Sequence, residues 1–226
     1  MAVVLDPAEL AANTVLFSGV SPVEVESLLF RLNGVVKRYS KGDVIFNAGL
    51  EATRLAVVVS GRINIYEQTQ EARQVLVREV GKDSVLGLMV MHTPGCKNWP
   101  GTAVATDETI TISLDLKIAQ NLIDRKDHEM LKLAPNISRL LAGELFATWR
   151  KLMVMDAASV EDKILIYLTE LDNESGKTGE VTVPFDREKM AEYFGVTRPS
   201  LSRALGNLRK RGFLEWRKNR FKLLRT

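Results

Sequence analysis

The sequence predicts an α+β protein that combines an N-terminal antiparallel β-roll, a long central helix and a C-terminal winged helix-turn-helix. Three observations lead to this fold class. Short runs rich in β-branched residues, separated by glycine-containing turns, fill residues 35–115. Apolar residues at helical spacing follow as far as residue 171. The chain then closes with two short helical patterns and two strand patterns. We assign the β-roll to residues 1–126, the central helix to 127–155 and the winged helix-turn-helix to 156–226.

The composition limits the class of protein. With 226 residues, 46% of them hydrophobic, the chain can bury a sizeable core. Its single cysteine, Cys96, excludes an internal disulfide and a multi-cysteine zinc or iron–sulfur site within one chain. Two histidines far apart in sequence, His92 and His128, argue against a metal-dependent β-barrel enzyme. There is no signal-like N-terminus and no apolar run near the ~18 residues of a membrane span, so we expect a cytoplasmic protein that does not enter membranes.

The charge is unevenly distributed along the chain. From residue 197 to the end there are ten Lys or Arg and one acid, Glu215, which gives this segment a net charge of +9. Because the whole chain carries +3, residues 1–196 carry −6. An acidic body with a basic end is typical of a protein that binds a polyanion through that end.

Local signals define the elements before the central helix. Ser21 and Pro22 supply an N-cap and a first-turn proline for a helical region in residues 15–34. Helical spacing resumes in residues 116–124. Between these helices we expect strands in VVKRYS (35–40), DVIFNAG (43–49), RLAVVVSGRINIYEQ (54–68), RQVLVREV (73–80) and GTAVATDETITISLD (101–115).

Two apolar stripes run along the central helix. One stripe can pack on the β-roll, and we expect the other to face a second copy of the chain in a homodimer. The alternative is a single broad stripe buried within one chain. Pro135 marks either the first turn of this helix or a kink. The residues that we assign to the dimer interface repeat every seven positions: Leu133, Leu140, Ala147 and Val154; the neighbouring stripe contains Ile137, Leu141, Leu145 and Leu152.

Capping residues divide the C-terminal segment into helices. Asp156 can cap a helix in VEDKILIYLTEL, and Asp186 caps a second in REKMAEYF. After the turn GVT, Thr197 caps a third helix whose Pro199 lies in the first turn, where the missing N–H costs almost nothing. In this helix we expect Leu201, Leu205 and Leu208 to be buried and Ser200, Arg203 and Asn207 to point outward. Two strands joined by a Lys218–Asn219 turn complete the wing.

Three stretches, in this order, resemble the CRP/FNR family of bacterial transcription regulators. YSKGDVIFNAG with LAVVVSGRINIYE resembles the β-roll signature, GKDSVLG the start of the ligand cassette, and VTRPSLSRAL the recognition helix. The resemblance implies a cyclic-nucleotide-binding-like β-roll that holds an effector, a homodimer joined through the central helix, and binding of double-stranded DNA at a palindromic promoter site. It also implies RNA polymerase as a partner.

The cassette departs from the cyclic-nucleotide branch of the family. That branch presents a Glu for the ribose and an Arg-Ser pair for the phosphate, whereas Leu88, Trp99 and Pro100 stand at these positions. A cyclic phosphate requires a guanidinium and a hydroxyl, so we expect an unknown small-molecule effector other than cAMP. The alternative is that the apolar side chains only fill the roll. The residues assigned to the effector site are Leu88, Met89, Met91, His92, Trp99 and Pro100.

Haem is a second interpretation of the same segment. His92 lies in MHTPGC, which is similar to the cassette of haem-containing, gas-sensing members of the family, where a histidine ligates iron. A solvated histidine is the alternative for His92, and His128, between two acids, is expected at the surface. The oxygen-sensing iron–sulfur branch is excluded because one cysteine cannot hold a cluster.

The recognition helix carries the candidate DNA-reading side chains. Arg203 matches the family's base-reading arginine, and the planar guanidinium can donate two hydrogen bonds to guanine O6 and N7. Arg198 is placed for a phosphate or an outer base, and Ser202 matches a serine of the oxygen-sensing branch. Pro199 replaces a glutamate found in many members, so one base pair is expected to be read differently. The full set of DNA-binding candidates is Arg198, Ser200, Ser202, Arg203, Asn207, Lys218 and Arg220, with Arg209, Lys210, Arg211 and Arg217 expected to attract phosphates.

These observations predict an effector-responsive, dimeric DNA-binding regulator without catalytic activity. A β-roll enzyme is the first rival interpretation, but the sequence shows no paired His and Cys, no metal-ligand cluster and no nucleophile elbow. A protein–protein signalling module is the second, and the basic C-terminal end argues against it.

Overall fold

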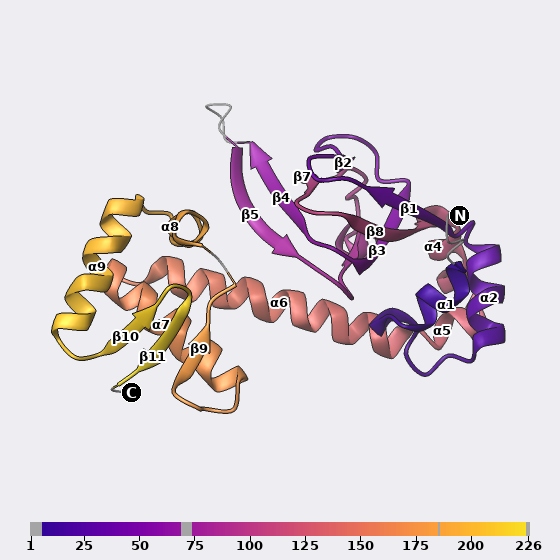
Figure 1. Cartoon of the computed structure of the whole chain (residues 1–226). Coiled ribbons are helices and arrows are strands. Elements are labelled where there is room, and N and C mark those ends of the chain that lie inside the picture. The colour runs from indigo at the N-terminus through magenta and orange to yellow at the C-terminus, as the bar shows by residue number, and fades with distance from the viewer. Residues whose placement is uncertain (1–5, 69–73, 185, 225–226) are drawn as a thin grey trace, which may run out of the picture. The chain divides into compact units, whose positions relative to one another are not determined.

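The computed structural model describes residues 6–68, 74–184 and 186–224 (Figure 1). The chain divides into two compact units, residues 1–143 and 144–226. The boundary falls inside helix α6 (Ala134–Asp156), so the central helix begins in one unit and ends in the other. A separate short helix, α5 (His128–Leu131), precedes it within the segment assigned to the central helix from sequence.

Unit 1 holds the predicted β-roll as two four-stranded antiparallel sheets. Their strand orders are β1-β8-β3-β6 and β2-β7-β4-β5. Each β-rich run of the sequence contains at least one strand, whereas β6 was not predicted because a two-residue strand leaves no periodicity. The strands are β1 (Val35–Tyr39), β2 (Val44–Phe46), β3 (Arg54–Ser60), β4 (Ile63–Gln68), β5 (Gln74–Val80), β6 (Val85–Leu86), β7 (Thr102–Ala105) and β8 (Thr109–Asp115).

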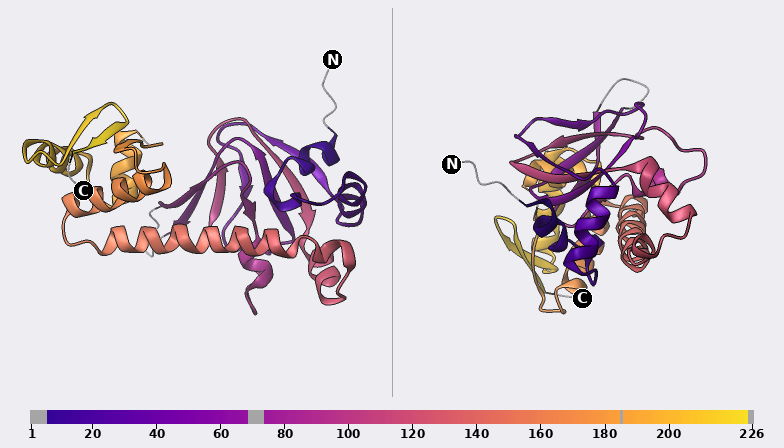
Figure 2. Two further views of the ribbon diagram at one scale, coloured as in Figure 1. Left: turned by 90° about the horizontal axis from the view of Figure 1, so that it is seen from below. Right: turned by 90° about the vertical axis from the view of Figure 1, so that its right-hand side faces the viewer.

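Helices cover one end of the roll. Helices α1 (Pro7–Ala12) and α2 (Pro22–Arg31), with the 3-10 turn η1 (Val15–Phe17), lie beside the strands, as Figure 2 shows in indigo. Ser21 caps α2 as predicted, because its side chain accepts from the Glu24 N–H while Glu24 bonds back to Ser21. Helix α3 (Leu88–His92) follows β6, and helix α4 (Leu116–Asp124) follows β8.

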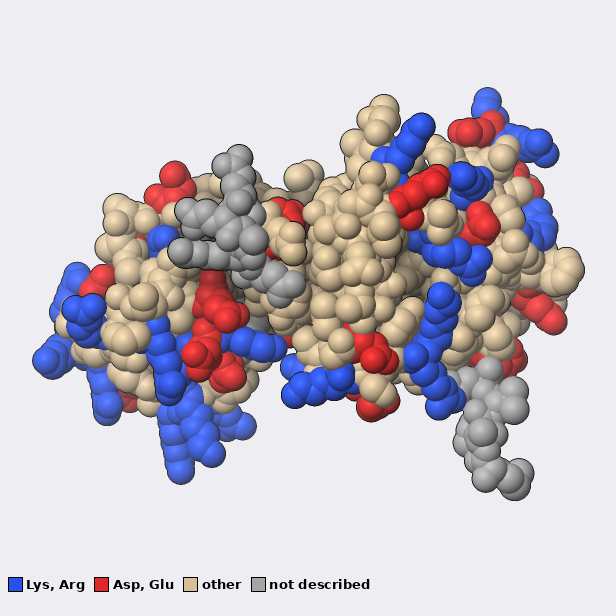
Figure 3. Space-filling view, turned by 90° about the horizontal axis from the view of Figure 1, so that it is seen from above, with Lys and Arg blue, Asp and Glu red and all other residues tan. Residues whose placement is uncertain are grey.

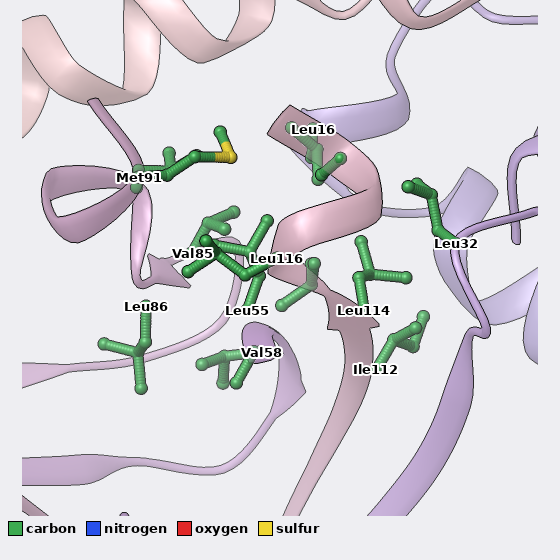
Figure 4. Packing of buried hydrophobic residues seen from close by; sticks show 14 of the residues in the cluster. Leu16, Leu32, Leu55, Val58, Val85, Leu86, Met91, Ile112, Leu114 and Leu116 are labelled. Carbon is green, nitrogen blue, oxygen red and sulfur yellow. The ribbon is translucent and has the colours of Figure 1, made fainter. Parts of the chain in front are cut away.

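The core of unit 1 lies where these helices meet the sheet of β1, β8, β3 and β6. Figure 4 shows Leu16 and Leu32 from the N-terminal segment gathered with Ile112 and Leu114 of β8. Met91 of α3 belongs to the same cluster of buried side chains. The cassette segment is therefore packed on the roll rather than being a free loop.

Unit 2 contains the predicted winged helix-turn-helix. Helix α7 (Val160–Glu174) is followed by β9 (Glu180–Thr182), then by helices α8 (Arg187–Phe194) and α9 (Arg198–Lys210). Strands β10 (Leu214–Arg217) and β11 (Arg220–Leu223) form the wing, in a sheet of order β10-β11-β9. Buried side chains from all of these elements form one core.

The structure decides two open points at the ends of α6. Pro135 is the second residue of the helix, which continues to Asp156, so the proline marks a first turn and not a kink. Asp156 was predicted to cap the next helix, and this prediction is wrong because Asp156 still belongs to α6. Ser159 is the N-cap of α7, and its hydroxyl accepts from the Asp162 N–H at 3.0 Å.

Candidate nucleic-acid interface and effector site

Helices α8 and α9 are joined by a tight turn. The Asp186 carboxylate accepts from the Lys189 N–H at 2.9 Å and starts α8. Gly195 ends it with a left-handed φ of 65°, a conformation that costs little only for glycine. Thr197 then caps α9 by accepting from the Ser200 N–H at 3.3 Å, with Pro199 in the first turn as predicted. The local sequence alone thus specifies helix, turn and helix.

The two faces of α9 are as predicted. Leu201, Ala204, Leu205 and Leu208 are buried, and Arg198, Ser202, Arg203 and Asn207 are exposed, while Ser200 is half-buried. The side chain of Arg203 lies beside the first turn of the helix, and its Nη2 is 3.5 Å from Ser200 Oγ. This arrangement leaves an arginine and hydroxyl groups on one accessible surface, which is the chemistry that base edges require.

Two of the candidate DNA-binding side chains have partners that the sequence did not reveal. Asn207 Nδ2 donates to Glu161 Oε1 of α7 at 3.1 Å, so this amide links α9 to α7. Arg198 Nη1 lies 3.9 Å from Glu188 Oε2, and both side chains are largely exposed. These pairs join residues 46 and 10 positions apart in the sequence, and no local sequence pattern predicts them.

The wing is a two-strand hairpin with a basic turn. Leu214 to Arg217 pair with Arg220 to Leu223, and Lys218 adopts a φ of 56° in the turn. The side chains of Lys218 and Arg220 are exposed. Figure 3 shows Lys and Arg side chains exposed on both units, while the excess of basic over acidic residues lies after residue 197, within unit 2.

The apolar residues of α6 are distributed differently from the prediction. Leu133, which directly precedes α6, is 1% exposed in the core of unit 1, and Val154 of α6 is 0% exposed in the core of unit 2, so neither has surface left for a partner chain. Leu140 is half-buried and Ala147 is exposed. The large exposed apolar side chains of α6 are Leu145, Phe146, Trp149, Leu152, Met153 and Met155, of which Leu145 and Leu152 belong to the second stripe. Ile137 of the second stripe is buried in the core of unit 1 as well, so both stripes contribute to the chain's own core, and periodicity alone could not show this.

The predicted effector residues divide into a buried group and an exposed group. Leu88, Met91 and Trp99 are buried, whereas Met89, His92 and Pro100 are exposed. The Trp99 ring lies parallel to Phe46, with centroids 3.6 Å apart and an angle of 9° between planes. A Cβ on Gly87, whose φ is 101°, would come within 3.1 Å of Trp99 Cη2, so the cassette backbone packs directly on the indole. Trp99 therefore forms a wall of the roll.

Small-molecule sites are typically hollows of about 300 to 1,000 Å³. One of about 570 Å³ lies beside α3 and the start of α4. Met91 and His92 line it, as do Cys96 and Lys97, which sequence reasoning did not assign to a site. Leu88, Met89, Trp99 and Pro100 are not among its lining residues. Within the described ranges, no three His, Cys, Asp or Glu side chains gather as a metal site would require. None of the described helices is both long and apolar enough to cross a membrane.

Comparison with known proteins agrees with this architecture. A model of the cyclic nucleotide-binding domain matches residues 36–126, and one of the Crp-like helix-turn-helix domain matches residues 162–226. The chain is 24% identical over 211 residues to a CRP-like cAMP-activated global transcriptional regulator of Mycobacterium tuberculosis, covering 91% of this chain and 90% of the other. It is also 24% identical over 196 residues to the fumarate and nitrate reduction regulatory protein of Salmonella typhi, covering 84% and 76%.

A solved structure shares the fold over most of the chain. The global regulator CLP of Xanthomonas campestris, described as c-di-GMP responsive, superposes with a TM-score of 0.68 and 20% identity, covering 91% of this chain and all of that one. The α+β class with its N-terminal roll and C-terminal helix-turn-helix is thereby confirmed. With the two matched domains and these relatives, the chain belongs to the CRP/FNR family of transcription regulators.

Proposed function

We propose that this protein is an effector-responsive regulator that binds a palindromic DNA site as a homodimer and has no catalytic activity. The observation that carries the proposal is the exposed face of α9, where Ser202 and Arg203 stand over a buried leucine stripe. The basic wing beside it supplies charges for the DNA backbone. Control of transcription then brings RNA polymerase as a further partner in the cytoplasm.

The exposed apolar face of α6 supports association of two copies. Leu145, Trp149 and Leu152 follow one another at spacings of four and three residues, which is the heptad pattern of a helix that packs on another helix. Their side chains are 72%, 48% and 65% exposed in the single chain. A second α6 would cover these side chains, and twofold symmetry would present two α9 helices to two half-sites.

The effector is proposed to be an organic molecule other than cAMP. Trp99 stands where the resemblance predicts a phosphate-binding arginine, and its ring is engaged with Phe46. The hollow beside α3 has buried Met91 and Leu116 and exposed His92 and Lys97 in its lining. An apolar body with an anionic group fits such a lining. Calorimetric titration with cAMP should therefore give no heat of binding.

Haem is the second candidate for the effector site. Three side chains that can each ligate haem iron line the same hollow, Met91, His92 and Cys96, so the donor set fits a haem. Bound there, haem would supply the gas-binding iron, and the chain would supply its ligands. An absorption spectrum of freshly purified protein tests this candidate, because a Soret band would appear only if haem is bound.

The proposed DNA-binding function is tested by selection from a pool of random-sequence duplexes. The purified protein should enrich one sequence with two symmetric halves, separated by about one helical turn of DNA. An Arg203→Ala variant carried through the same selection serves as control and should enrich it less. Failure of the unmodified protein to enrich any sequence would contradict the proposal.

A further inference from the structure

The turn of the wing is attached to the segment that leads into α8. The Val183 N–H donates to the Asn219 carbonyl at 2.8 Å, and Asn219 Nδ2 donates to the Val183 carbonyl at 3.2 Å. Arg187 Nη2 donates to the Lys218 carbonyl at 2.9 Å. Both turn residues are therefore held by the rest of the unit, and the wing does not end in a free hairpin.

Arg187 holds the turn from an unusual environment. It is the first residue of α8, and its side chain is half-buried. The guanidinium carbon lies 4.8 Å from the centroid of Phe221 and 5.8 Å from that of Trp216, within the range of cation–π attraction. Among the residues that the structure describes, no carboxylate lies within salt-bridge distance of Arg187. The cation is thus stabilised by two ring faces and a backbone carbonyl.

This environment carries a cost that a simple surface charge would not have. Burial lowers the pKa of Arg187, which shows that its charged form is disfavoured where it lies. Lys218, whose carbonyl Arg187 binds, has a left-handed φ of 56°, which is unfavourable for a residue with a Cβ. The hydrogen bond from Arg187 therefore fixes a strained turn in one conformation.

We propose that Arg187 is a positioning residue for the wing: its hydrogen bond to the Lys218 carbonyl presents the side chains of Lys218 and Arg220 to the DNA backbone. Arg187 does not itself bind phosphate in this proposal. The inference rests on the proposed DNA-binding function, since the wing has nothing to contact without DNA.

A second contact fastens the wing in the same way. The guanidinium of Arg209, near the end of α9, lies 5.4 Å from the ring centroid of Trp216. Trp216 of β10 therefore contacts arginines from both helices of the helix-turn-helix. Because these contacts join α9 to the wing, a displaced wing would no longer be held in a fixed position relative to α9.

Lysine at position 187 should not be able to do what Arg187 does. The planar guanidinium can lie over a ring and donate in its own plane to a carbonyl, whereas an ammonium is a compact point charge. A phosphate, in contrast, is bound well by either cation. Arg187→Lys therefore separates positioning from direct phosphate binding.

The test is a double-mutant cycle on DNA affinity. Arg187→Gln and Arg187→Lys are each made in the unmodified protein and in a Lys218→Ala/Arg220→Ala background. The probe is a short duplex of scrambled sequence at low salt, because wing contacts to phosphate do not depend on sequence. We expect each Arg187 variant to lower affinity about tenfold with the wing side chains present, and to cause no further loss without them.

Arg211→Gln is the matched control. It removes the same charge and a cation–π contact, since the Arg211 guanidinium lies 4.8 Å from the Phe213 centroid, but among the described hydrogen bonds it has none to the wing turn. Its effect should be equal in both backgrounds. Thermal unfolding of each variant shows that it is folded.

Two results would overturn the inference: an equal loss in both backgrounds, which indicates direct phosphate contact by Arg187, or no loss in either. If the unmodified protein binds no duplex at all, the DNA-binding proposal itself fails, and the inference about Arg187 fails with it; a protein that binds DNA but shows either of the two results above overturns the inference alone.

Discussion

At the scale of single residues, α9 separates the side chains that build the unit from those that can read DNA. Leu201, Leu205 and Leu208 are buried. Arg203 is exposed, and among the described side-chain hydrogen bonds its one partner is the Ser200 hydroxyl at 3.5 Å. Asn207 is exposed but linked to Glu161. Of the side chains on this face, Arg203 is therefore the one best placed to donate two hydrogen bonds to guanine.

Arg203→Ala should reduce specificity more than affinity for DNA in general. Loss of a bidentate arginine is expected to cost about 1 to 3 kcal/mol of discrimination between the selected site and a scrambled duplex. Non-specific affinity should be nearly unchanged, because the backbone contacts remain. Titrations of both duplexes by fluorescence anisotropy measure the two affinities. Equal losses on both duplexes would mean that Arg203 binds the backbone.

Arg220→Ala should have the opposite effect. A phosphate contact contributes to binding of any sequence, so affinity for the selected and the scrambled duplex should fall together. The slope of log affinity against log salt should become shallower by about 1, the value for one phosphate contact. The same titrations at several salt concentrations provide the measurement, and an unchanged slope would remove Arg220 from the interface.

The ion pair of Asp127 with Arg31 should make the folded protein less stable in acid. Hydrogen bonds from Arg31, at 2.8 Å to each carboxylate oxygen, lower the pKa of Asp127 from 3.8 to about 2. A carboxyl group with a lowered pKa in the folded state contributes stability that is present above pH ~4 and is lost as the pH falls toward ~2. Because both side chains are partly exposed, the contribution is about 1 kcal/mol or less.

The comparison of unmodified protein with Asp127→Asn tests this contribution. Urea unfolding should show the variant less stable near neutral pH, with the difference shrinking between pH ~4 and ~2. Asp115→Asn is a useful comparison, since Asp115 caps α4 without an arginine partner among the described ion pairs. A difference for Asp127→Asn that does not change with pH would contradict the role of the Arg31 pair.

At the scale of elements, Gly143 is the weak position of α6. It lies within the helix, where glycine costs about 0.5 to 1 kcal/mol relative to alanine, and an added Cβ would meet nothing within 4 Å. Gly143→Ala should therefore raise the free energy of unfolding by about that amount, measured by denaturant titration. A decrease would show that another surface approaches the helix at this position.

The elements that the sequence predicts well are those with local signals. Ser21 with Pro22 and Thr197 with Pro199 mark helix starts through residues one and two positions apart, and the structure has both. The prediction that Asp156 caps α7 was wrong because two capping residues, Asp156 and Ser159, lie close together in the sequence. The packing of α6 decides which of them is used. Local pattern has no access to that choice.

Side-chain placement within the sites depended on contacts between distant segments. The pairing of Trp99 with Phe46 joins residues 53 positions apart, and no sequence pattern gives the position of such a ring. The hollow beside α3 is lined partly by Leu116 and Lys117 of α4, a helix that lies outside the cassette in the sequence. The sequence therefore predicts which types of side chain the cassette contains, but not how these side chains are arranged in space.

At the scale of the whole molecule, the exposed apolar side chains of α6 belong to the same compact unit as helices α8 and α9. Arg150 forms an ion pair with Glu170 of α7 at 3.0 Å, and Met155 Cε lies 3.1 Å from where a Cβ on Gly195 would stand. The end of α6 is thus packed on α7 and on the turn before α9. Whatever α6 packs against should therefore affect the placement of α9.

Leu145→Glu should convert the proposed dimer to a monomer. A second α6 packed on Leu145 would bring two glutamates together in an apolar seam, where their charges are desolvated and repel. Ala147→Glu is the matched control, because residue 147 lies about 200° around the helix from residue 145 and is also exposed. Sedimentation equilibrium should find the first variant monomeric and the second dimeric, and the reverse result would restore the first stripe as the interface.

The central claim is that two copies of this chain read one symmetric DNA site. The most direct measurement is the mass of the complex with the selected duplex, together with the affinity for a duplex that carries only one half of it. We predict two chains on the full duplex and an affinity at least about tenfold lower for the half-site, since one α9 then has no specific bases to contact. A single chain on the full duplex, or equal affinity for the half-site, would contradict the account.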